Sequence, residues 1–396
     1  MTSALAPENT AGPPAPRPAA YVAVILWLQA GFTASLAIFA QLPWPAALWQ
    51  AALCLAATLP LLLAVAQIIS LPKLLRKLPR AFLAALRILG NLAYLLIPWL
   101  GWAALLWLLN RGGLPWDGAL RAAAAIALFS YATAALFILR FRPRPHDVEI
   151  TRTDVPIPDL PEPFHGYQIL HLSDLHAGQF LSIDALRARL QSARSLHPDL
   201  IVFTGDLANR KVRRAQEAAV LLADIASADG LVAVLGNHDN WIGEERVRKV
   251  LSDRGATVLV NRHTTVEHNA ARLYLAGVGD ASYTGRDDLP AALAGIPEGA
   301  SVILLSHSPD IIHKLPARGP ALVLCGHTHG GQIVLPLIGP LYVPSRVGRR
   351  FAAGLHRLNA GWLYVNRGLG EVFPPVRIGC PPEVALLTLT AAPPSD

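Results

Sequence analysis

The sequence predicts an α/β domain that follows a module of four membrane-spanning helices. Two observations support this prediction: residues 1–144 are strongly apolar, and residues 145–396 alternate short apolar runs with helical segments. Of the 396 residues, 53% are hydrophobic and only 15% are charged. Soluble domains carry roughly 25% charged residues, so this composition excludes a disordered chain and is unusual for a wholly soluble protein.

The two parts of the chain also differ in charge and residue type. Residues 1–144 contain 11 Lys or Arg but only two acidic residues, whereas residues 145–396 contain 23 basic and 25 acidic residues. All 13 His residues lie in the second part. The three cysteines have neither disulfide nor zinc-site spacing. We therefore expect a disordered leader at 1–20, a membrane module at 21–144 and a separate His-rich domain at 145–396.

Four stretches of the first part contain no charged residue. A helix needs about 20 apolar residues to cross a bilayer core of about 30 Å, and these stretches meet or approach that length. Four buried helices of a soluble protein are the alternative, but no intervening segment can cover so much apolar surface. The four stretches are Tyr21–Ala40, Ala46–Ile69, Ile88–Leu109 and Ala122–Leu139.

The Lys and Arg residues of the short loops predict the orientation of this module, because cytoplasmic loops are enriched in them. Nine lie in the leader, between the second and third stretches, or after the fourth stretch, whereas only Arg111 and Arg121 lie on the other side. An even number of spans places both termini on the basic side. The sequence therefore predicts a multi-pass integral membrane protein whose termini and His-rich domain are cytoplasmic.

Five short apolar runs of the second part each end in a polar cluster. Such runs, bounded by turn residues, are typical of buried strands, and helical patterns at Ser182–Leu196 and Arg213–Ile225 lie between them. In α/β folds, functional side chains collect at the carboxyl ends of the strands. The five predicted strands are Tyr167–Leu172, Leu200–Thr204, Leu231–Leu235, Val302–Leu305 and Leu322–Cys325.

The polar clusters supply carboxylate, imidazole and amide groups, which suit Mn, Fe or Zn. A single histidine is usually a structural residue, but five ordered clusters disfavour that explanation. The ligands are too many for one four-coordinate ion and enough for two ions that share a carboxylate, an arrangement that recurs in phosphoester hydrolysis. Gly205, Gly236 and Gly326 are expected to let backbone approach metal or phosphate. The candidates are Asp174, His176, Asp206, Asn237, His238, His307, His327 and His329.

In this order and spacing, the motifs resemble those of the calcineurin-like metallophosphoesterase superfamily. They are Asp174-x-His176, Gly205-Asp206, Gly236-Asn237-His238-Asp239, His307 and Gly326-His327-x-His329. The tail GHTHGGQIVLPLIGPLYVPSR, with YVNRGLG at 364–370 and PPEVALLTL at 381–389, resembles the membrane-associated branch, which is similar to UDP-2,3-diacylglucosamine pyrophosphatases. The resemblance covers residues 148–391 and implies a sandwich of two mixed β-sheets flanked by helices.

The resemblance also implies a role for each side chain. His238 would be the general acid that protonates the leaving oxygen, with a charge state set close to the working pH. Asn209 departs from the family pattern GDxxD, whose second Asp orients the catalytic His in phosphoprotein phosphatases, and this places a protein-phosphatase role in doubt. The first metal ion would be held by Asp174, His176, Asp206 and His329, and the second by Asp206, Asn237, His307 and His327.

Three further segments bear on the substrate. Two basic clusters either hold a second phosphate, face anionic lipid or form an ordinary solvated surface. The apolar segment Ile333–Val343 forms a groove for acyl chains, contacts a membrane or is a buried hairpin. The basic clusters are Arg210, Lys211, Arg213 and Arg214 after the Asp206 loop, and Arg346, Arg349 and Arg350 after the Gly-rich tail.

We therefore expect a membrane-anchored, binuclear-metal phosphoesterase that hydrolyses a phosphodiester or pyrophosphate bond in a lipid-linked substrate at the bilayer. One alternative is a phosphodiesterase for soluble nucleotides or cyclic nucleotides. Another is a membrane sensor or transporter with a regulatory phosphoesterase domain, although the spans lack the ionisable residues of transporters. A nucleic-acid partner is not expected, because residues 145–396 carry no excess of basic residues.

Overall fold

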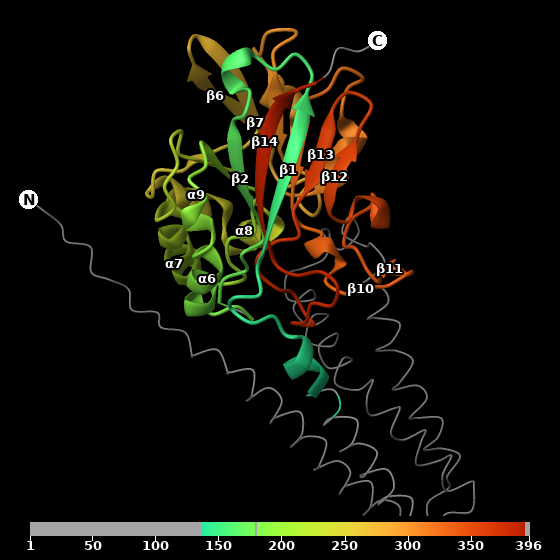
Figure 1. Ribbon diagram of the computed structural model, residues 1–396. Helices are drawn as coiled ribbons and strands as arrows, with labels where there is room; N and C mark the ends of the chain where they lie inside the picture. Colours follow the sequence, from blue (N-terminus) through green and yellow to red (C-terminus); the bar gives the residue numbers. More distant parts are fainter. Residues whose placement is uncertain (1–132, 134–135, 179, 393–396) are drawn as a thin grey trace, which may run out of the picture. The chain divides into compact units, whose positions relative to one another are not determined.

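A computed structural model describes residues 133, 136–178 and 180–392 (Figure 1). The chain divides into two compact units, Met1–Ala134 and Ala135–Asp396, and nearly all of the described residues belong to the second. The predicted leader and membrane spans lie outside the described residues, apart from a helical segment at 136–141. Within the described part, no helix combines the length and apolar character that a membrane crossing requires.

The first of two large sheets has six strands in the order β1-β14-β2-β3-β4-β5. Strands β2 to β5 are parallel, and β14 pairs antiparallel with β2 and parallel with β1, so the sheet is mixed. Its strands are β1 (Glu149–Ile157), β2 (Gln168–Leu172), β3 (Leu200–Phe203), β4 (Leu231–Ala233), β5 (Thr257–Val258) and β14 (Glu383–Ala391).

The second large sheet also has six strands, in the order β12-β13-β9-β8-β7-β6. Its four central strands are parallel and its two outer pairs are antiparallel. A separate two-stranded hairpin, β10 (Val334–Leu335) and β11 (Gly339–Pro340), lies between β9 and β12 in the chain. The strands of the second sheet are β6 (Arg262–His268), β7 (Ala271–Gly277), β8 (Val302–Leu305), β9 (Leu322–Cys325), β12 (Gly354–Arg357) and β13 (Trp362–Val365).

Helices cover the outer faces of both sheets. Helices α6, α7 and α9 lie against the outer face of the first sheet (Figure 1), and α10 packs on the second. The Ser182 hydroxyl caps α6 by accepting the Ala185 backbone N–H. The helices are α6 (Ile183–Leu190), α7 (Val212–Ala223), α8 (Asn237–Ile242), α9 (Glu244–Ser252) and α10 (Leu289–Leu293), with short 3-10 helices at Glu162–Phe164, Ala193–Ser195, Pro309–Lys314, His329–Gly331 and Gly348–Phe351.

The strand residues alternate between two apolar cores. On β3, Leu200 and Val202 face the core between the sheets, whereas Ile201 and Phe203 face the core beneath the helices. Both faces of a central strand are therefore buried, and this explains why the strand is a continuous apolar run instead of an alternating one. The resulting order of layers is helices, sheet, sheet and helix.

The predicted sandwich of two mixed sheets flanked by helices is confirmed for the described residues. The five predicted strands form β2, β3, β4, β8 and β9 with small changes at their ends. The predicted helix at Ser182–Leu196 is too long, because α6 ends at Leu190 and a 3-10 helix follows at Ala193–Ser195. All five of these strands are parallel members of their sheets, so their carboxyl ends point toward the site described next.

Candidate functional site

The structure brings the predicted ligands together at the carboxyl ends of these strands. Three overlapping groups of side chains each place one ligand atom per residue within 4.8 Å of the others. Asp206 belongs to two of these groups and His176 to two, so the groups form one continuous cluster. The groups are Asp174, His176 and His329; His176, Asp206 and His238; and Asp174, Asp206 and His307.

The backbone of these residues is strained. Asp174, His176, Asp206, His327 and His329 all have positive φ, between 45° and 69°. Non-glycine residues in this left-handed region cost of order 1–3 kcal/mol each and gather at functional sites. Hydrogen bonds between the loops hold the conformation, because the Asp174 N–H donates to the Gly205 carbonyl and the His176 N–H to the Asp206 carbonyl. The fold therefore maintains this arrangement at an energetic cost.

Asp206 occupies the middle of the cluster. Its Oδ1 accepts the backbone N–H of His238 at 2.9 Å. Its Oδ2 lies 3.5 Å from Nε2 of His176 and 3.3 Å from Nε2 of His307. One carboxylate oxygen thus faces histidines from two different strand ends.

On one side of Asp206, three more ligand atoms converge. Asp174 Oδ1 lies 3.6 Å from His176 Nε2 and 3.4 Å from His329 Nε2, and the two histidine nitrogens are 3.0 Å apart. The other ring nitrogen of His176, Nδ1, donates to Asn209 Oδ1 at 2.7 Å. Such a bond fixes the tautomer, so that Nε2 presents its lone pair to the cluster.

On the other side, His307 is fixed in the same way. Its Nδ1 donates to the Thr204 carbonyl at 2.7 Å, and its Nε2 lies 3.2 Å from Nδ1 of His327. The buried Oδ1 of Asn237 has no hydrogen-bond partner among the described residues. Unsatisfied buried polar atoms are costly, so this amide oxygen and these imidazoles are suited to a ligand that accepts their lone pairs.

The cluster fits divalent metal ions. Lone pairs of imidazoles and carboxylates face one another at 3.0–3.6 Å, and Asp174 Oδ1 and Asn237 Oδ1 are buried without partners within the described chain. Burial lowers the pKa of His307, but Asp206 and Asp174 outweigh that effect and raise it to about 10. The carboxylates therefore attract a cation, and a divalent metal can take the place of the proton.

Glycines make room for the ligand side chains. A Cβ on Gly236 would lie 2.2 Å from Asp206 Oδ1, and one on Gly326 would lie 2.3 Å from Asp174 Oδ2. Gly205 has φ +94°, and a Cβ there would lie 2.5 Å from the Gly236 backbone nitrogen. These glycines therefore make room for the carboxylates, for the Ser173 hydroxyl and for each other, and their approach to metal or phosphate stays a prediction.

A pocket of about 270 Å³ opens over the cluster. The cluster supplies part of its lining through His176, Asp206, Asn237, His238, His327 and His329. The rest is largely apolar and aromatic, and several of these side chains are also exposed at the rim. These other lining residues include Trp241, Tyr283, Ile333, Leu341, Tyr342, Pro344, Val372, Phe373 and Pro374.

Comparisons with known proteins agree with this geometry. Residues 167–331 match the sequence profile of the family described as calcineurin-like phosphoesterase. The uncharacterized metallophosphoesterase YkuE of Bacillus subtilis is 31% identical over 276 residues, which cover 69% of this chain and 94% of that protein. This chain belongs to the calcineurin-like phosphoesterase family. It is accordingly an enzyme, a metal-dependent phosphoesterase.

Two other relatives match the same domain. Phosphodiesterase YaeI of Escherichia coli is 31% identical over 227 residues, covering 56% of this chain and 82% of the relative. A Danio rerio protein named transmembrane protein with metallophosphoesterase domain is 31% identical over 257 residues, covering 62% of this chain and 58% of the relative. The names of these relatives describe phosphodiesterase chemistry and membrane association in those proteins.

The predicted general acid of this phosphoesterase, His238, lines the pocket beside the cluster. Its ring centroid lies 4.6 Å from that of His176 and 4.4 Å from that of Trp241. Burial lowers the pKa of His238 to about 4, and the expected charge state close to the working pH stays a prediction. The negative charge of a bound phosphoester acts in the opposite direction, because a nearby negative charge favours the protonated imidazole.

Asp239 is a buried residue of this site that the motif analysis quoted but left without a role. Its Oδ2 accepts the backbone N–H groups of Asp206 and Gly236 at 2.7 and 2.9 Å, and its Oδ1 accepts that of Leu207 at 2.9 Å. The buried carboxylate thereby ties the loop after β3 to the loop after β4. The signal was its place in the Asn-His-Asp motif, but its backbone partners could not be predicted from the sequence.

The predicted phosphate-binding role of the basic clusters gains no support, because none of their seven residues lines the pocket. On α7, Arg213 and Arg214 form ion pairs with Glu217 at the surface. The apolar segment is not a buried hairpin either. It forms β10 and β11, and Leu337 and Ile338 between them are exposed.

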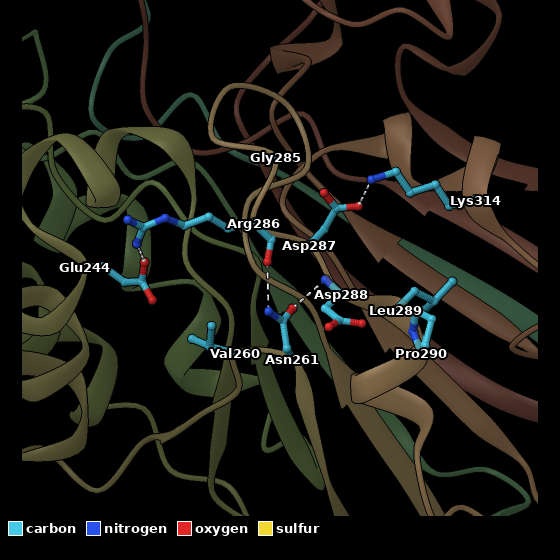
Figure 2. A pocket seen from close by; sticks show the side chains of 10 residues that line it. All are labelled: Glu244, Val260, Asn261, Gly285, Arg286, Asp287, Asp288, Leu289, Pro290 and Lys314. Atoms are coloured by element: carbon cyan, nitrogen blue, oxygen red, sulfur yellow. Dashed lines mark hydrogen bonds and ion pairs between the residues drawn. The ribbon is translucent and has the colours of Figure 1, made fainter. Parts of the chain in front are cut away.

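A larger cavity, of about 710 Å³, has a different set of lining residues, which Figure 2 shows. Its charged side chains are already paired, Arg286 with Glu244 and Lys314 with Asp287. Asn261 is also engaged, with its side chain bonded to the backbone of Arg286 and Asp288. None of the predicted ligands lines this cavity, so the smaller pocket over the Asp and His cluster is the candidate active site.

Proposed function

We propose that this enzyme is a membrane-anchored, binuclear-metal phosphodiesterase or pyrophosphatase that acts on a lipid-linked substrate at the cytoplasmic face of a bilayer. In this proposal residues 1–20 are a leader, 21–144 form four spans and 145–396 form the catalytic domain. The observation that carries the proposal is the pocket itself, in which a cluster of metal-binding residues lies within an exposed apolar rim.

The proposed ligand sets follow the two sides of Asp206. Two divalent ions held there would neutralise phosphate charge and activate a water molecule for attack. Asn209 and the Thr204 carbonyl hold the two histidine rings in the required tautomer. Asp174, His176, Asp206 and His329 are proposed to hold one ion, and Asp206, Asn237, His307 and His327 the other.

His238 is proposed to protonate the leaving oxygen. Its position in the pocket lining, beside His176 and Trp241, supports this role. Because burial keeps its pKa low, binding of the anionic substrate is proposed to raise that pKa and charge the ring only when the site is loaded. General acids of this kind contribute about 10²–10⁴-fold to a rate.

The apolar rim supports a substrate with a lipid portion. Leu341, Tyr342 and Phe373 line the pocket and remain exposed to solvent in the described chain. Apolar surface next to a site for a charged phosphate suits a substrate that has both characters. A pyrophosphate of the diacylglucosamine type has both, and the tail of this chain resembles enzymes that cleave it.

A second candidate is a soluble nucleotide or cyclic nucleotide. It is favoured by two aromatic residues of the rim, Trp241 and Tyr283, whose ring centroids are 5.9 Å apart. Both are more than half exposed, and exposed aromatic rings beside a phosphate site can stack with a nucleobase. The two candidates therefore differ in what the rim contacts, which is the lipid portion of the substrate in the first and a nucleobase in the second.

Turnover by the purified full chain in detergent micelles tests the proposal. We expect the catalytic efficiency, kcat/KM, for a lipid-linked pyrophosphate or phosphodiester to exceed that for a cyclic nucleotide or a nitrophenyl phosphodiester. The His238→Gln variant is the control, since it must lower both activities. Higher efficiency on the nucleotide would favour the second candidate, and no turnover of any phosphoester would favour a regulatory domain.

A further inference from the structure

The hairpin of β10 and β11 presents apolar side chains to solvent. Leu337 at its tip is fully exposed, Ile338 is 58% exposed and Tyr342 is 71% exposed. Leu337 also has φ +66°, a left-handed conformation that is unfavourable for a large side chain. Two costs, strain and apolar exposure, therefore coincide at one tip.

The exposed apolar residues are not scattered over the domain. Among the described residues, every exposed large apolar side chain lies in the hairpin segment, in the pocket rim or in the helical segment at 136–141. Exposed apolar side chains that gather on a few segments are typical of an interaction site. The members are Leu136, Phe137, Leu139, Trp241, Tyr283, Leu337, Ile338, Leu341, Tyr342 and Phe373.

Backbone hydrogen bonds join these segments. The Arg377 N–H donates to the Phe141 carbonyl at 3.0 Å, which connects the 136–141 helical segment to the loop that carries Phe373. The Val334 N–H donates to the Ile378 carbonyl at 2.8 Å, which connects that loop to β10. The helical segment and the hairpin lie toward the same end of the domain, away from β6 (Figure 1).

The exposed charges within these segments have one sign. The segments 136–144, 333–351 and 372–378 contain seven Arg residues and no Asp or Glu; Arg377 is buried and the other six are exposed. The adjacent Asp147 accepts the backbone N–H of Arg144. Nearby Asp310 is engaged by the hydroxyl of Ser345 and the backbone N–H of Arg346. Basic residues that flank apolar side chains are the pattern of a surface for anionic lipid, where each base contributes about 1 kcal/mol.

We propose that this surface, defined by the hairpin tip, Phe373 and residues 136–144, docks on an anionic lipid bilayer and holds the pocket mouth at headgroup level. The inference rests on the proposed membrane anchor, the four spans of residues 21–144. It adds a second and reversible contact, between the surface of the catalytic domain and the bilayer. Residues 136–139 end the last predicted span and residues 140–144 follow it directly. A bilayer crossed by that span is therefore proposed to lie within reach of the hairpin, to which Phe141 is connected through the loop of Arg377 and Ile378.

The hairpin is suited to present a lipid headgroup to the metal cluster. Ile333, Leu341 and Tyr342 line the pocket, whereas Leu337 and Ile338 lie beyond it at the tip. Docking of the tip therefore places the pocket lining next to the acyl boundary of the bilayer. A substrate headgroup reaches the cluster in this arrangement without leaving the membrane.

Depth-dependent fluorescence quenching tests the contact without relying on activity. The full chain is labelled at Ile338→Cys or, as a control on the distant β6–β7 turn, at Ala270→Cys, and is placed in nanodiscs of phosphatidylcholine and phosphatidylglycerol. Cys325 and Cys380 are buried, and wild-type protein treated identically gives the background labelling. We expect spin-labelled acyl chains to quench the Ile338 label and not the Ala270 label.

The other outcomes contradict the proposal. Equal quenching of both labels by aqueous iodide, with none by lipid, would show that the tip stays in water. Protection of the Ile338 label from both quenchers would show that protein covers it, either a second copy or another part of this chain. Omitting phosphatidylglycerol must weaken the lipid quenching, because the Arg residues would lose their anionic partners.

Turnover separates failure of the docking contact from failure of the proposed substrate. We expect the Leu337→Glu and Ile338→Glu double variant to lose about tenfold or more in rate on lipid-embedded substrate, because burial of these two side chains is lost. Its rate on a soluble nitrophenyl phosphodiester should stay unchanged. The matched control is Asn269→Glu with Ala270→Glu. If the Ile338 label is quenched by lipid but the enzyme does not turn over the lipid substrate, the proposed substrate is wrong and the docking contact stands. If the hairpin double variant cleaves lipid-embedded substrate as fast as the control variant, the docking contact is wrong.

Discussion

Asn209 accepts a hydrogen bond from the ring of His176, with 2.7 Å between Asn209 Oδ1 and His176 Nδ1. The Asn209 side chain also donates to the His176 carbonyl at 3.4 Å. The residue that departs from the GDxxD pattern therefore orients a proposed metal ligand, and its side-chain hydrogen bonds among the described residues go to His176, not to His238. A neutral amide supplies the geometry of this bond without an additional buried charge.

Asn209 should matter for metal affinity more than for the chemical step. Replacing it with Leu leaves His176 Nδ1 without an acceptor, so we expect metal affinity to fall about 10–100-fold, the usual effect of losing such a partner. Asn209→Asp keeps an acceptor and should retain most of the affinity. Titration of metal-free protein with Mn²⁺ or Zn²⁺ measures both variants, and unchanged affinity in Asn209→Leu would contradict this role.

His238 should affect turnover without affecting metal content. We expect His238→Gln to slow hydrolysis by about 10²–10⁴-fold, the usual contribution of a general acid. The loss should shrink for a nitrophenyl leaving group, because a good leaving group needs less protonation. Steady-state kinetics on alkyl and nitrophenyl diesters check this prediction, and an equal loss on both would rule out the general-acid role.

The catalytic domain should fold without the membrane module. A chain of residues 136–396 keeps the bonds of Phe141 and Arg142 to the domain, whereas one starting after Arg144 loses them. We expect the longer version to cleave a small soluble diester at close to the full-length rate and to act more slowly on substrate in vesicles, since tethering raises local concentration. Equal rates on vesicle substrate would argue that the spans serve another purpose.

Acid should destabilise the domain through His171. This histidine is fully buried, and burial lowers its pKa from 6.5 to about 4. Between pH 4 and pH 6.5 the unfolded chain therefore binds more protons than the folded one. The stability that neutral His171 contributes is fully present above pH 6.5 and is lost as the pH falls toward 4. The contribution of this one residue is about 3 kcal/mol across the window.

The His171→Gln variant isolates that contribution. Urea unfolding of metal-loaded residues 136–396 at several pH values gives the free energy of unfolding for both proteins. The introduced glutamine does not titrate, and its side chain can still bond the Thr204 hydroxyl that His171 contacts at 2.9 Å. We expect a shallower loss of stability in the variant below pH 6.5, and parallel pH profiles would show that His171 does not contribute.

The sequence was informative where local pattern and topology act together. Each strand such as Leu200–Phe203 is buried on both faces, so it forms an apolar run whose end is visible in the sequence. Because parallel strands end at one edge of a sheet, convergence of Asp174 and Asp206 could be predicted without knowing distances. His307 follows β8 of the second sheet, so its approach depends on how the two sheets pack. The proposed metal ligands themselves remain predictions.

The features that the sequence did not provide depend on tertiary partners. Asp239 bonds the backbone of Asp206, 33 positions earlier, and no local pattern encodes such a bond. The apolar composition of Ile333–Val343 could not distinguish a buried hairpin from an exposed one, because burial depends on whether another element covers it. The left-handed backbone at Asp174 likewise has a tertiary partner, because its N–H donates to the Gly205 carbonyl.

The central claim is a binuclear site bridged by Asp206, and metal content tests it most directly. Elemental analysis of purified protein should find two divalent ions per chain in the wild type and in His238→Gln. In Asp206→Asn it should find a large loss of both ions, because Asp206 Oδ2 faces both histidine groups. A wild type with a single ion, or equal metal content in the Asp206→Asn and His238→Gln variants, would contradict the account.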